Sequence, residues 1–141
     1  MNPLIAPSDT LTEAGIKMLR QQLDCFEEHA DDLPVLDDPE PVHRMRVASR
    51  RMRAVLRVFR EGLGPWADAM KDHLSGIAGE LGAVRDSDVY RKFLERYADH
   101  DCPVKHVRSV RAMARAEYAF RCRAMQPLIT HVRSGEHAAF I

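Results

Sequence analysis

Apolar residues recur every three or four positions along most of the chain, which is the spacing of amphipathic helices. The first such stretch runs from about residue 10 to residue 30, and Thr10 and Glu13 at its start have the spacing of a capping box. The same periodicity returns over residues 39–60, 65–100 and 103–133. Runs of β-branched residues are nearly absent. The pattern therefore predicts an all-α fold, a four-helix bundle with no strand.

Turn and helix-breaking residues mark the ends of these stretches. Asp38 is expected to cap the second helix, with Pro39 at its first position, where a missing N–H costs nothing. Gly62 and Gly64 are expected to end that helix. Inside the later helices, bending or close packing is expected at Gly76, Gly79, Gly82 and Pro127.

Composition indicates one globular domain. The length of 141 residues favours a single unit over residues 1–141, and 45% hydrophobic with 30% charged residues is an ordinary globular balance. No apolar run approaches the roughly 20 residues that span a bilayer, and the first residues do not read as a signal peptide. Three widely spaced cysteines form neither a disulfide framework nor a metal motif, which predicts a reducing, cytoplasmic location.

The net charge of zero hides a strong segregation of charge along the chain. Residues 1–41 contain ten acidic and two basic residues, whereas residues 42–60 contain seven arginines and no acid. Such separation matters for partners because a basic surface attracts anions whatever the total charge.

At 100° per residue, a histidine and four arginines of the second helix form one row. His43, Arg46, Arg50, Arg53 and Arg57 fall within an arc of about 80°. The adjoining arc is an apolar seam, predicted to pack, made of Val42, Met45, Ser49, Met52, Leu56 and Phe59. Arg44 and Arg51 lie outside the row.

Two interpretations of this row stay open. Acids of the first and third helices neutralise it within the chain, or it binds an external polyanion. Arginine without lysine favours phosphate, because the planar guanidinium grips two oxygens at once. A second basic row, Lys105, Arg108, Arg111 and Arg115, spans about 120° of the fourth helix. It is either a solvated face or the other wall of one shared groove.

Two segments resemble the signatures of a known family. Residues 42–59, VHRMRVASRRMRAVLRVF, and residues 81–89, LGAVRDSDV, are similar to the two motifs of the CHAD domain, a histidine-bearing α-helical domain. The resemblance implies two similar four-helix bundles around a basic channel that binds inorganic polyphosphate. It implies no catalytic activity and no cofactor, and it allows association with polyphosphate granules. The candidate polyphosphate ligands are His43, Arg46, Arg50, Arg53, Arg57, Arg108, Arg111 and Arg115.

The chain departs from the family in length, since the usual unit is about twice as long, with a second basic helix. Either this is a half-unit that completes its channel as a two-fold homodimer, which is the preferred hypothesis, or it is a truncated chain.

Arg85, Asp86 and Asp88 in the second motif are interpreted as structural or secondary residues. One acid is expected to pair with an arginine of residues 39–60, while Arg85 packs or joins the basic face. Metal binding is disfavoured, because residues 86 and 88 lie about 200° apart on a helix.

Two alternative functions stay open. A nucleic-acid-binding protein would share the basic face, but only 6% of residues are aromatic, so bases have few stacking partners. A metal-dependent hydrolase of phosphoanhydrides, or its accessory protein, needs a metal cluster or an activated nucleophile. The seven histidines are scattered along the sequence and form no H-x₃-H motif.

Overall fold

The computed structural model describes residues 4–34 and 37–140, and these residues contain helices and no strand. The elements are α1 (Leu11–Ala30), α2 (Glu40–Val58), α3 (Arg60–Leu63), α4 (Trp66–His100), α5 (Val104–Arg133) and a 3₁₀ helix η1 (Glu136–Phe140). The predicted all-α fold is confirmed. None of the helices in this described part has the length and apolarity needed to cross a membrane.

The helix starts follow the capping residues found in the sequence. The Thr10 hydroxyl accepts the Glu13 N–H at 3.2 Å, and the Glu13 carboxylate accepts the Thr10 N–H at 2.8 Å, which confirms the capping box. These hydrogen bonds, first of all the one from the Thr10 backbone, lower the pKa of Glu13. Asp38 accepts the Glu40 N–H at 2.9 Å, but the N-cap position of α2 is Pro39, so the placement of Pro39 as the first helical residue was wrong by one position.

The short α3 was not predicted. Gly62 and Gly64 were expected to end the second helix, whereas α2 ends at Val58 and α3 forms a separate helical turn that contains Gly62. Gly62 lies against the start of α1, where the Thr12 hydroxyl donates to its carbonyl. A Cβ at position 62 would come within 3.0 Å of the Thr12 backbone nitrogen, so only glycine fits there. Gly64, with φ of 83°, then reverses the chain into α4.

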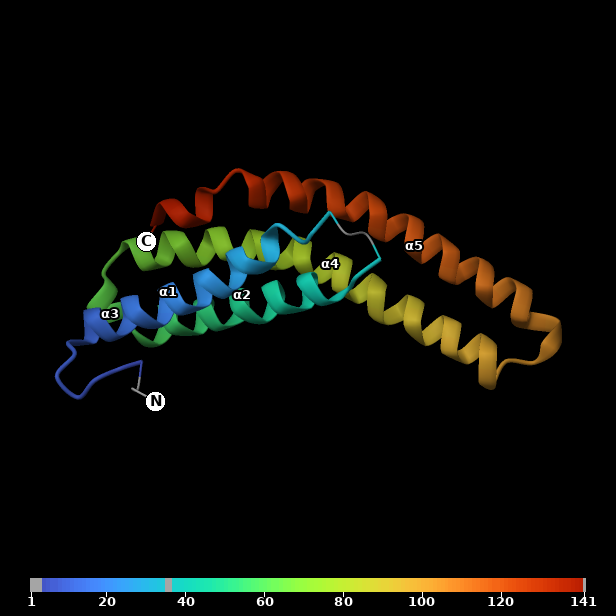
Figure 1. Ribbon diagram of the computed structural model, residues 1–141, viewed down its shortest axis with the longest axis horizontal. Coiled ribbons are helices and arrows are strands. Elements are labelled where there is room, and N and C mark those ends of the chain that lie inside the picture. The colour runs from blue at the N-terminus through green and yellow to red at the C-terminus, as the bar shows by residue number, and fades with distance from the viewer. Residues whose placement is uncertain (1–3, 35–36, 141) are drawn as a thin grey trace.

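The two longest helices, α4 and α5, continue without interruption through the glycines and the proline that were expected to disturb them. α4 stays helical past its three glycines, and only Gly76 has a neighbouring side chain near the place of a Cβ, His131 Cε1 at 4.0 Å. The expectation that these glycines permit close packing is therefore wrong for Gly79 and Gly82. α5 stays one helix through Pro127 and arches along α4 (Figure 1).

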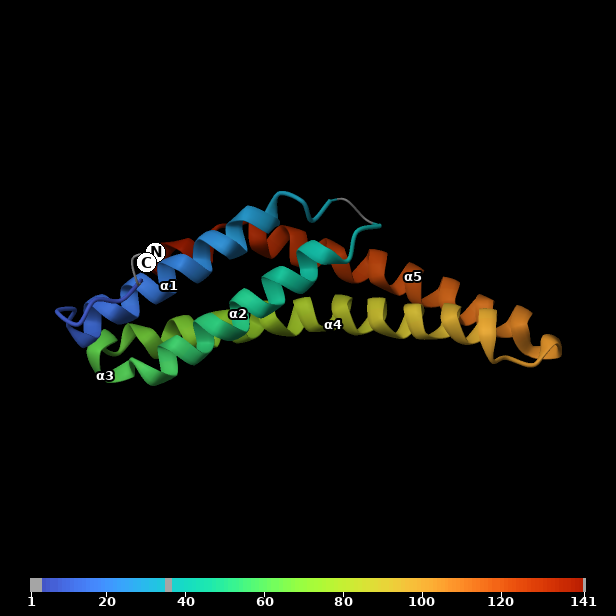
Figure 2. The same cartoon turned by 60° about the horizontal axis from the view of Figure 1, so that its bottom comes forward.

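The helices form a bundle with a protruding arm. α1, α2, the first half of α4 and the last part of α5 enclose the core, whereas the second half of α4 and the first half of α5 continue beyond the bundle as a helix pair (Figures 1 and 2). Each of the four long helices contributes fully buried core side chains, among them Phe26, Met52, Leu74, Ile77 and Leu128. The predicted four-helix bundle is thus present, with an arm that the periodicity did not indicate.

A buried ion pair stands where the arm leaves the bundle. Arg121 of α5 is 1% exposed, and its Nε donates to Oδ1 of Asp88 on α4, which is 6% exposed. Its Nη2 also donates to the Asp38 carbonyl at 3.4 Å, which ties the loop before α2 to α5. One turn away, the Ser87 hydroxyl contacts the Glu117 carbonyl and carboxylate, each at 2.9 Å. The expectation that an acid of this motif pairs with an α2 arginine is wrong, because Asp88 faces α5.

Breaking this pair should destabilise the whole fold. Arg121→Met leaves Asp88 buried without its cation, and we expect the free energy of unfolding to fall by about 3–5 kcal/mol in urea titrations. As the matched control, Arg44→Met breaks the exposed Arg44–Glu40 pair and should cost less than about 1 kcal/mol. The double variant Asp88→Leu, Arg121→Met should recover most of the loss. A loss below about 1 kcal/mol for Arg121→Met would contradict this role.

Candidate anion-binding site

Three arginines of the predicted row line one hollow between α2 and α4. Arg50, Arg53 and Arg57 border a space of about 440 Å³, together with Lys71 and Ser75 of α4. Ala54 completes the lining, so four cations and no acid face this space. Such a concentration of positive charge suits an anion with several oxygens.

The cations of this hollow are poorly neutralised by the protein itself. Among the described residues, no acidic oxygen lies within 4.0 Å of Arg46, Arg50, Arg53 or Arg57. Lys71 has Asp68 at a distant 3.9 Å. The interpretation that acids of α1 and α4 neutralise the row in cis is therefore not supported within this part of the chain.

α2 can present these cations because its other face is anchored in the core. Phe59, at the end of the predicted apolar seam, is half-buried. The other residues of the seam are buried, as predicted: Val42, Met45, Ser49, Met52 and Leu56. Arg50 and Arg57 are exposed, while Arg53 is half-buried, and its buried Nε makes no hydrogen bond to the described residues. Arg53 thus borders the hollow while its Nε is a buried donor without a partner among the described residues.

The remaining members of the row lie nearer the start of α2. His43 is half-buried and Arg46 is exposed, and neither lines the hollow. By helical spacing they continue the row for about 10 Å beyond Arg50. Outside the row, Arg44 is held by Glu40 at 2.6 Å and Arg51 is exposed.

The α5 row lines a different space. Arg111 and Arg115 border a hollow of about 540 Å³ in the arm, and Glu95 and Asp99 are also in its lining. Arg111 Nη2 contacts the Asp99 carboxylate at 3.3 Å, so part of this row is neutralised. Arg108 and Lys105 are exposed and line neither hollow.

The two rows do not form the single groove that they were considered to share. The two hollows have no residue in common. α2 packs on α1 and α4 within the bundle, whereas the first half of α5 packs on α4 in the arm. The long helices α4 and α5 carry the second row away from the first.

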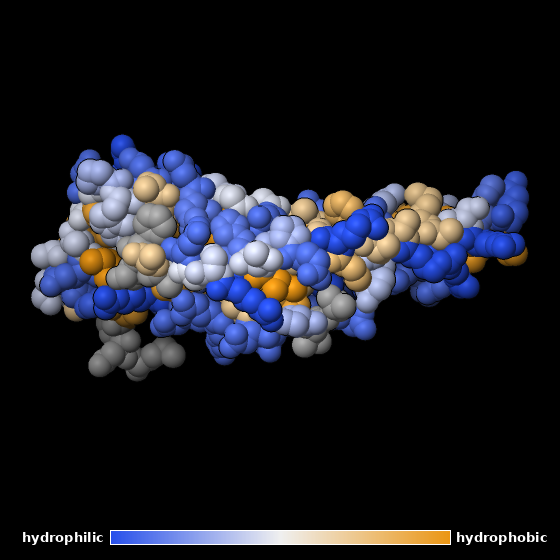
Figure 3. Space-filling view, turned by 90° about the horizontal axis from the view of Figure 1, so that it is seen from above, coloured by the Kyte–Doolittle hydropathy of each residue, from blue (hydrophilic) through white to orange (hydrophobic). Residues whose placement is uncertain are grey.

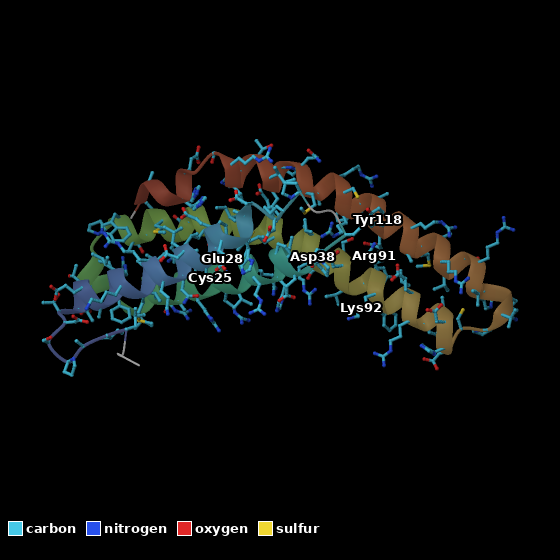
Figure 4. The ribbon with its side chains drawn as sticks, viewed as in Figure 1. Cys25, Glu28, Asp38, Arg91, Lys92 and Tyr118 are labelled. Carbon is cyan, nitrogen blue, oxygen red and sulfur yellow. The ribbon has the colours of Figure 1, made fainter. Side chains whose placement is uncertain are left out.

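The second sequence motif lies at the root of the arm, beside the loop before α2. Arg85 is half-buried and borders a hollow of about 530 Å³ with Asp88, Arg91 and Lys92, while Asp86 is exposed and outside it. Arg91 lies over the Tyr118 ring, 4.9 Å from its centroid, and Figure 4 shows the two side chains approaching each other from α4 and α5.

Tyr118 links this corner to the start of α2. Its hydroxyl donates to Asp37 at 2.9 Å, and this hydrogen bond, together with the nearby Cys122, raises the pKa of Tyr118. Arg121 also donates to the Asp38 carbonyl, so two hydrogen bonds from α5 hold the residues just before α2.

Sequence reasoning missed Lys71 and Ser75, which complete the α2 hollow. They are four residues apart on α4, so they lie on one face of that helix. A lone lysine followed by a serine carries no distinctive signal, and only the packing of α4 on α2 brings the two side chains to the arginines.

Comparison with known families gives one match. The family model of the CHAD domain matches residues 17–140, nearly the whole chain. No curated protein and no solved structure matched.

The lack of counter-charges predicts that the row lowers stability when no anion is bound. Arg53→Met keeps most of the apolar stem but removes a half-buried guanidinium that three neighbouring cations repel. We expect the free energy of unfolding to rise by about 0.5–1 kcal/mol in low-salt urea titrations. Arg51→Met, on the exposed side of the same helix, should change it by no more than a few tenths. Destabilisation by Arg53→Met would mean that the guanidinium has a structural role.

Proposed function

This chain belongs to the CHAD family, and we propose that it binds inorganic polyphosphate, without catalysis, through the row His43, Arg46, Arg50, Arg53 and Arg57. The observation that carries the proposal is the α2 hollow, in which three of these arginines and Lys71 face one space with no acid in its lining. The family association with polyphosphate names the ligand.

The geometry suits a linear chain of phosphates. Each guanidinium donates two parallel N–H bonds, which match a pair of phosphate oxygens. Arg50 and Arg57 are two turns apart, about 10 Å, and the row from His43 to Arg57 extends over about 20 Å. A linear polyanion lying along α2 therefore meets a cation at nearly every turn. Lys71 adds a compact charge from the opposite wall of the hollow.

We assign a secondary part to the arm. Arg108, Arg111 and Arg115 supply a second set of cations on α5, which a longer ligand or a second copy of the chain brings into use. Glu95 and Asp99 beside them weaken the local field, so we expect a smaller contribution from this set than from α2.

The arm offers a surface for the homodimer, which would add a second set of cationic rows. Large apolar side chains are exposed there on both helices, with Phe93 at 61%, Val89 at 51%, Met113 at 48% and Phe120 at 45%. The space-filling view shows apolar surface gathered along this part of the molecule (Figure 3). An isologous contact between two arms covers it and doubles the number of cationic rows.

We propose that this binding takes place in the cytoplasm, in association with polyphosphate granules. The cysteines Cys25, Cys102 and Cys122 are free in the structure, in keeping with a reducing compartment.

Removing two cations from the hollow should weaken binding strongly. Arg50→Ala with Arg53→Ala should raise the Kd for long-chain polyphosphate well over tenfold, since each charged hydrogen bond is worth about 1.5–3 kcal/mol. The matched control is Arg44→Ala with Arg51→Ala, which removes the same charge from the same helix outside the row. Titration calorimetry at fixed salt, with circular dichroism to check helicity, measures both. Equal weakening by the two variants would show that net charge, and not the hollow, determines affinity.

Two further outcomes separate the alternative functions. Duplex or single-stranded nucleic acid that displaces polyphosphate at equal phosphate concentration would favour a nucleic-acid-binding role. Release of phosphate from polyphosphate in the presence of Mg²⁺ or Mn²⁺ would replace the non-catalytic role with a hydrolytic one.

The dimer is tested through the arm. We expect light scattering to give twice the chain mass for the wild type. Val89→Ser combined with Phe93→Ser should shift the mass toward the monomer, because each substitution removes apolar surface that the contact between arms would cover. Leu11→Ser, at an exposed apolar position of α1 in the bundle, is the control and should leave the mass unchanged. A wild-type monomer at all protein concentrations, with or without polyphosphate, would exclude the dimer.

A further inference from the structure

Three helical elements bring two histidines and a glutamate together at the end of the bundle away from the arm. His73 comes from the first half of α4, His131 from the last turn of α5 and Glu136 from η1, which follows α5 and lies beside the first part of α4 (Figure 1). One ligand atom from each of the three lies within 4.8 Å of the other two. The two imidazole rings meet edge to face, with centroids 5.2 Å apart.

A second carboxylate orients one of these histidines. Glu80, two turns after His73 on α4, has its Oε2 at 3.1 Å from Nδ1 of His131. A carboxylate in this position holds the proton on Nδ1 and leaves the lone pair of Nε2 available. Histidines that bind metals are typically held in this way by a second-shell acid. This hydrogen bond is an observation independent of the clustering.

We propose that His73, His131 and Glu136 bind a zinc ion, with Glu80 as the residue that positions His131. Two imidazoles and one carboxylate are a donor set that suits Zn²⁺ and similar transition ions, whereas Mg²⁺ and Ca²⁺ prefer oxygen alone. Three protein ligands leave the fourth tetrahedral position to water.

The ligand atoms, which lie within 4.8 Å of one another, must move closer by up to about 1.4 Å to hold the ion. Zinc bonds of about 2.0–2.2 Å place tetrahedral ligand atoms about 3.4 Å apart. His73 Nδ1 and Glu136 Oε2 are 4.0 Å apart, and the Glu136 side chain is 67% exposed, so it is free to rotate inward. The side chains of His73 and His131 are 14% and 25% exposed, which keeps the site partly shielded and still open to an ion.

The surroundings favour a cation at this position. Glu80 and Glu136 contribute two negative charges, and Glu27 lies 3.7 Å from the neighbouring His137. Bound zinc would connect η1 to both α4 and α5 and so fasten the C-terminal segment to the bundle.

The site is separate from the proposed polyanion site. His73 lies about 200° around α4 from Lys71, so the two face opposite sides of that helix. Zinc binding therefore does not rest on the proposed function, and the failure of either leaves the other intact.

Equilibrium dialysis of the full chain against Zn²⁺ tests the proposal. We expect one ion per chain, and at least tenfold weaker binding for His131→Gln and for Glu136→Gln. Glu80→Gln should weaken binding about tenfold, the lower end of the range for second-shell changes. His100→Gln and His106→Gln, at exposed positions outside the cluster, are the matched controls and should bind as the wild type does.

Co²⁺ provides a readout that a merely structural role for these residues would not affect. The wild type and a variant with all three cysteines replaced by serine should both show the visible bands of tetrahedral Co²⁺, without thiolate charge transfer. His131→Gln should lose these bands while circular dichroism shows unchanged helicity. The proposal is overturned if the wild type binds no stoichiometric ion, if His131→Gln binds as tightly as the wild type, or if the cysteine variant loses the ion.

Discussion

The buried pair of Asp88 and Arg121 fixes the relation of the helices on which the proposed binding surface depends. It joins α4 to α5 where the two leave the bundle, and through the Asp38 carbonyl it also holds the loop before α2. A charge pair in this environment contributes little net stability by itself, but an unpaired partner costs several kcal/mol. The pair therefore acts mainly as a register device, because a shifted packing of α4 on α5 would leave a buried charge uncompensated.

α2 begins at this fixed loop, and its two faces have different properties: one is packed in the core and the other carries the cations. One face needs dense apolar packing, and Met45, Met52 and Leu56 provide it by burial against α1 and α4. The other face holds cations that repel one another, and no described acid relieves them within 4.0 Å. The packing of the apolar face stabilises the helix against the repulsion between its cations, since an isolated helix with this row of cations would be unstable.

Much of this arrangement could be predicted from the sequence because it is encoded locally. The capping box, the prolines and the 3.6-residue periodicity locate the four long helices, and the same periodicity separates the arginine row from the seam. The row's neighbours could not be predicted in this way. Lys71 reaches the hollow only through the packing of α4 on α2, and Arg121 reaches Asp88 only through the packing of α5 on α4.

The histidine cluster shows the same limit. His73 and His131 are far apart in the sequence and follow no metal-binding spacing, so a search for short motifs passes over them. They meet because α4 and α5 are antiparallel and of similar length, which returns the last turn of α5 to the first half of α4. Short motifs detect sites built on one helix, and they miss sites built by an antiparallel pair.

The separation of the two basic rows has a consequence for the kind of ligand that the fold suits. Under the proposed function, a small anion would occupy the α2 hollow alone and gain nothing from the cations of the arm. A polymeric anion bound at α2 would be present at a high effective concentration near Arg111 and Arg115, so weak contacts there would add to its affinity. The mixed charges of the arm hollow, with Arg111 partly neutralised by Asp99, limit this gain and oppose tight capture of small anions. On these grounds we expect the split arrangement to favour long polyanions over short ones, and a second chain placed along the arm would extend the same effect.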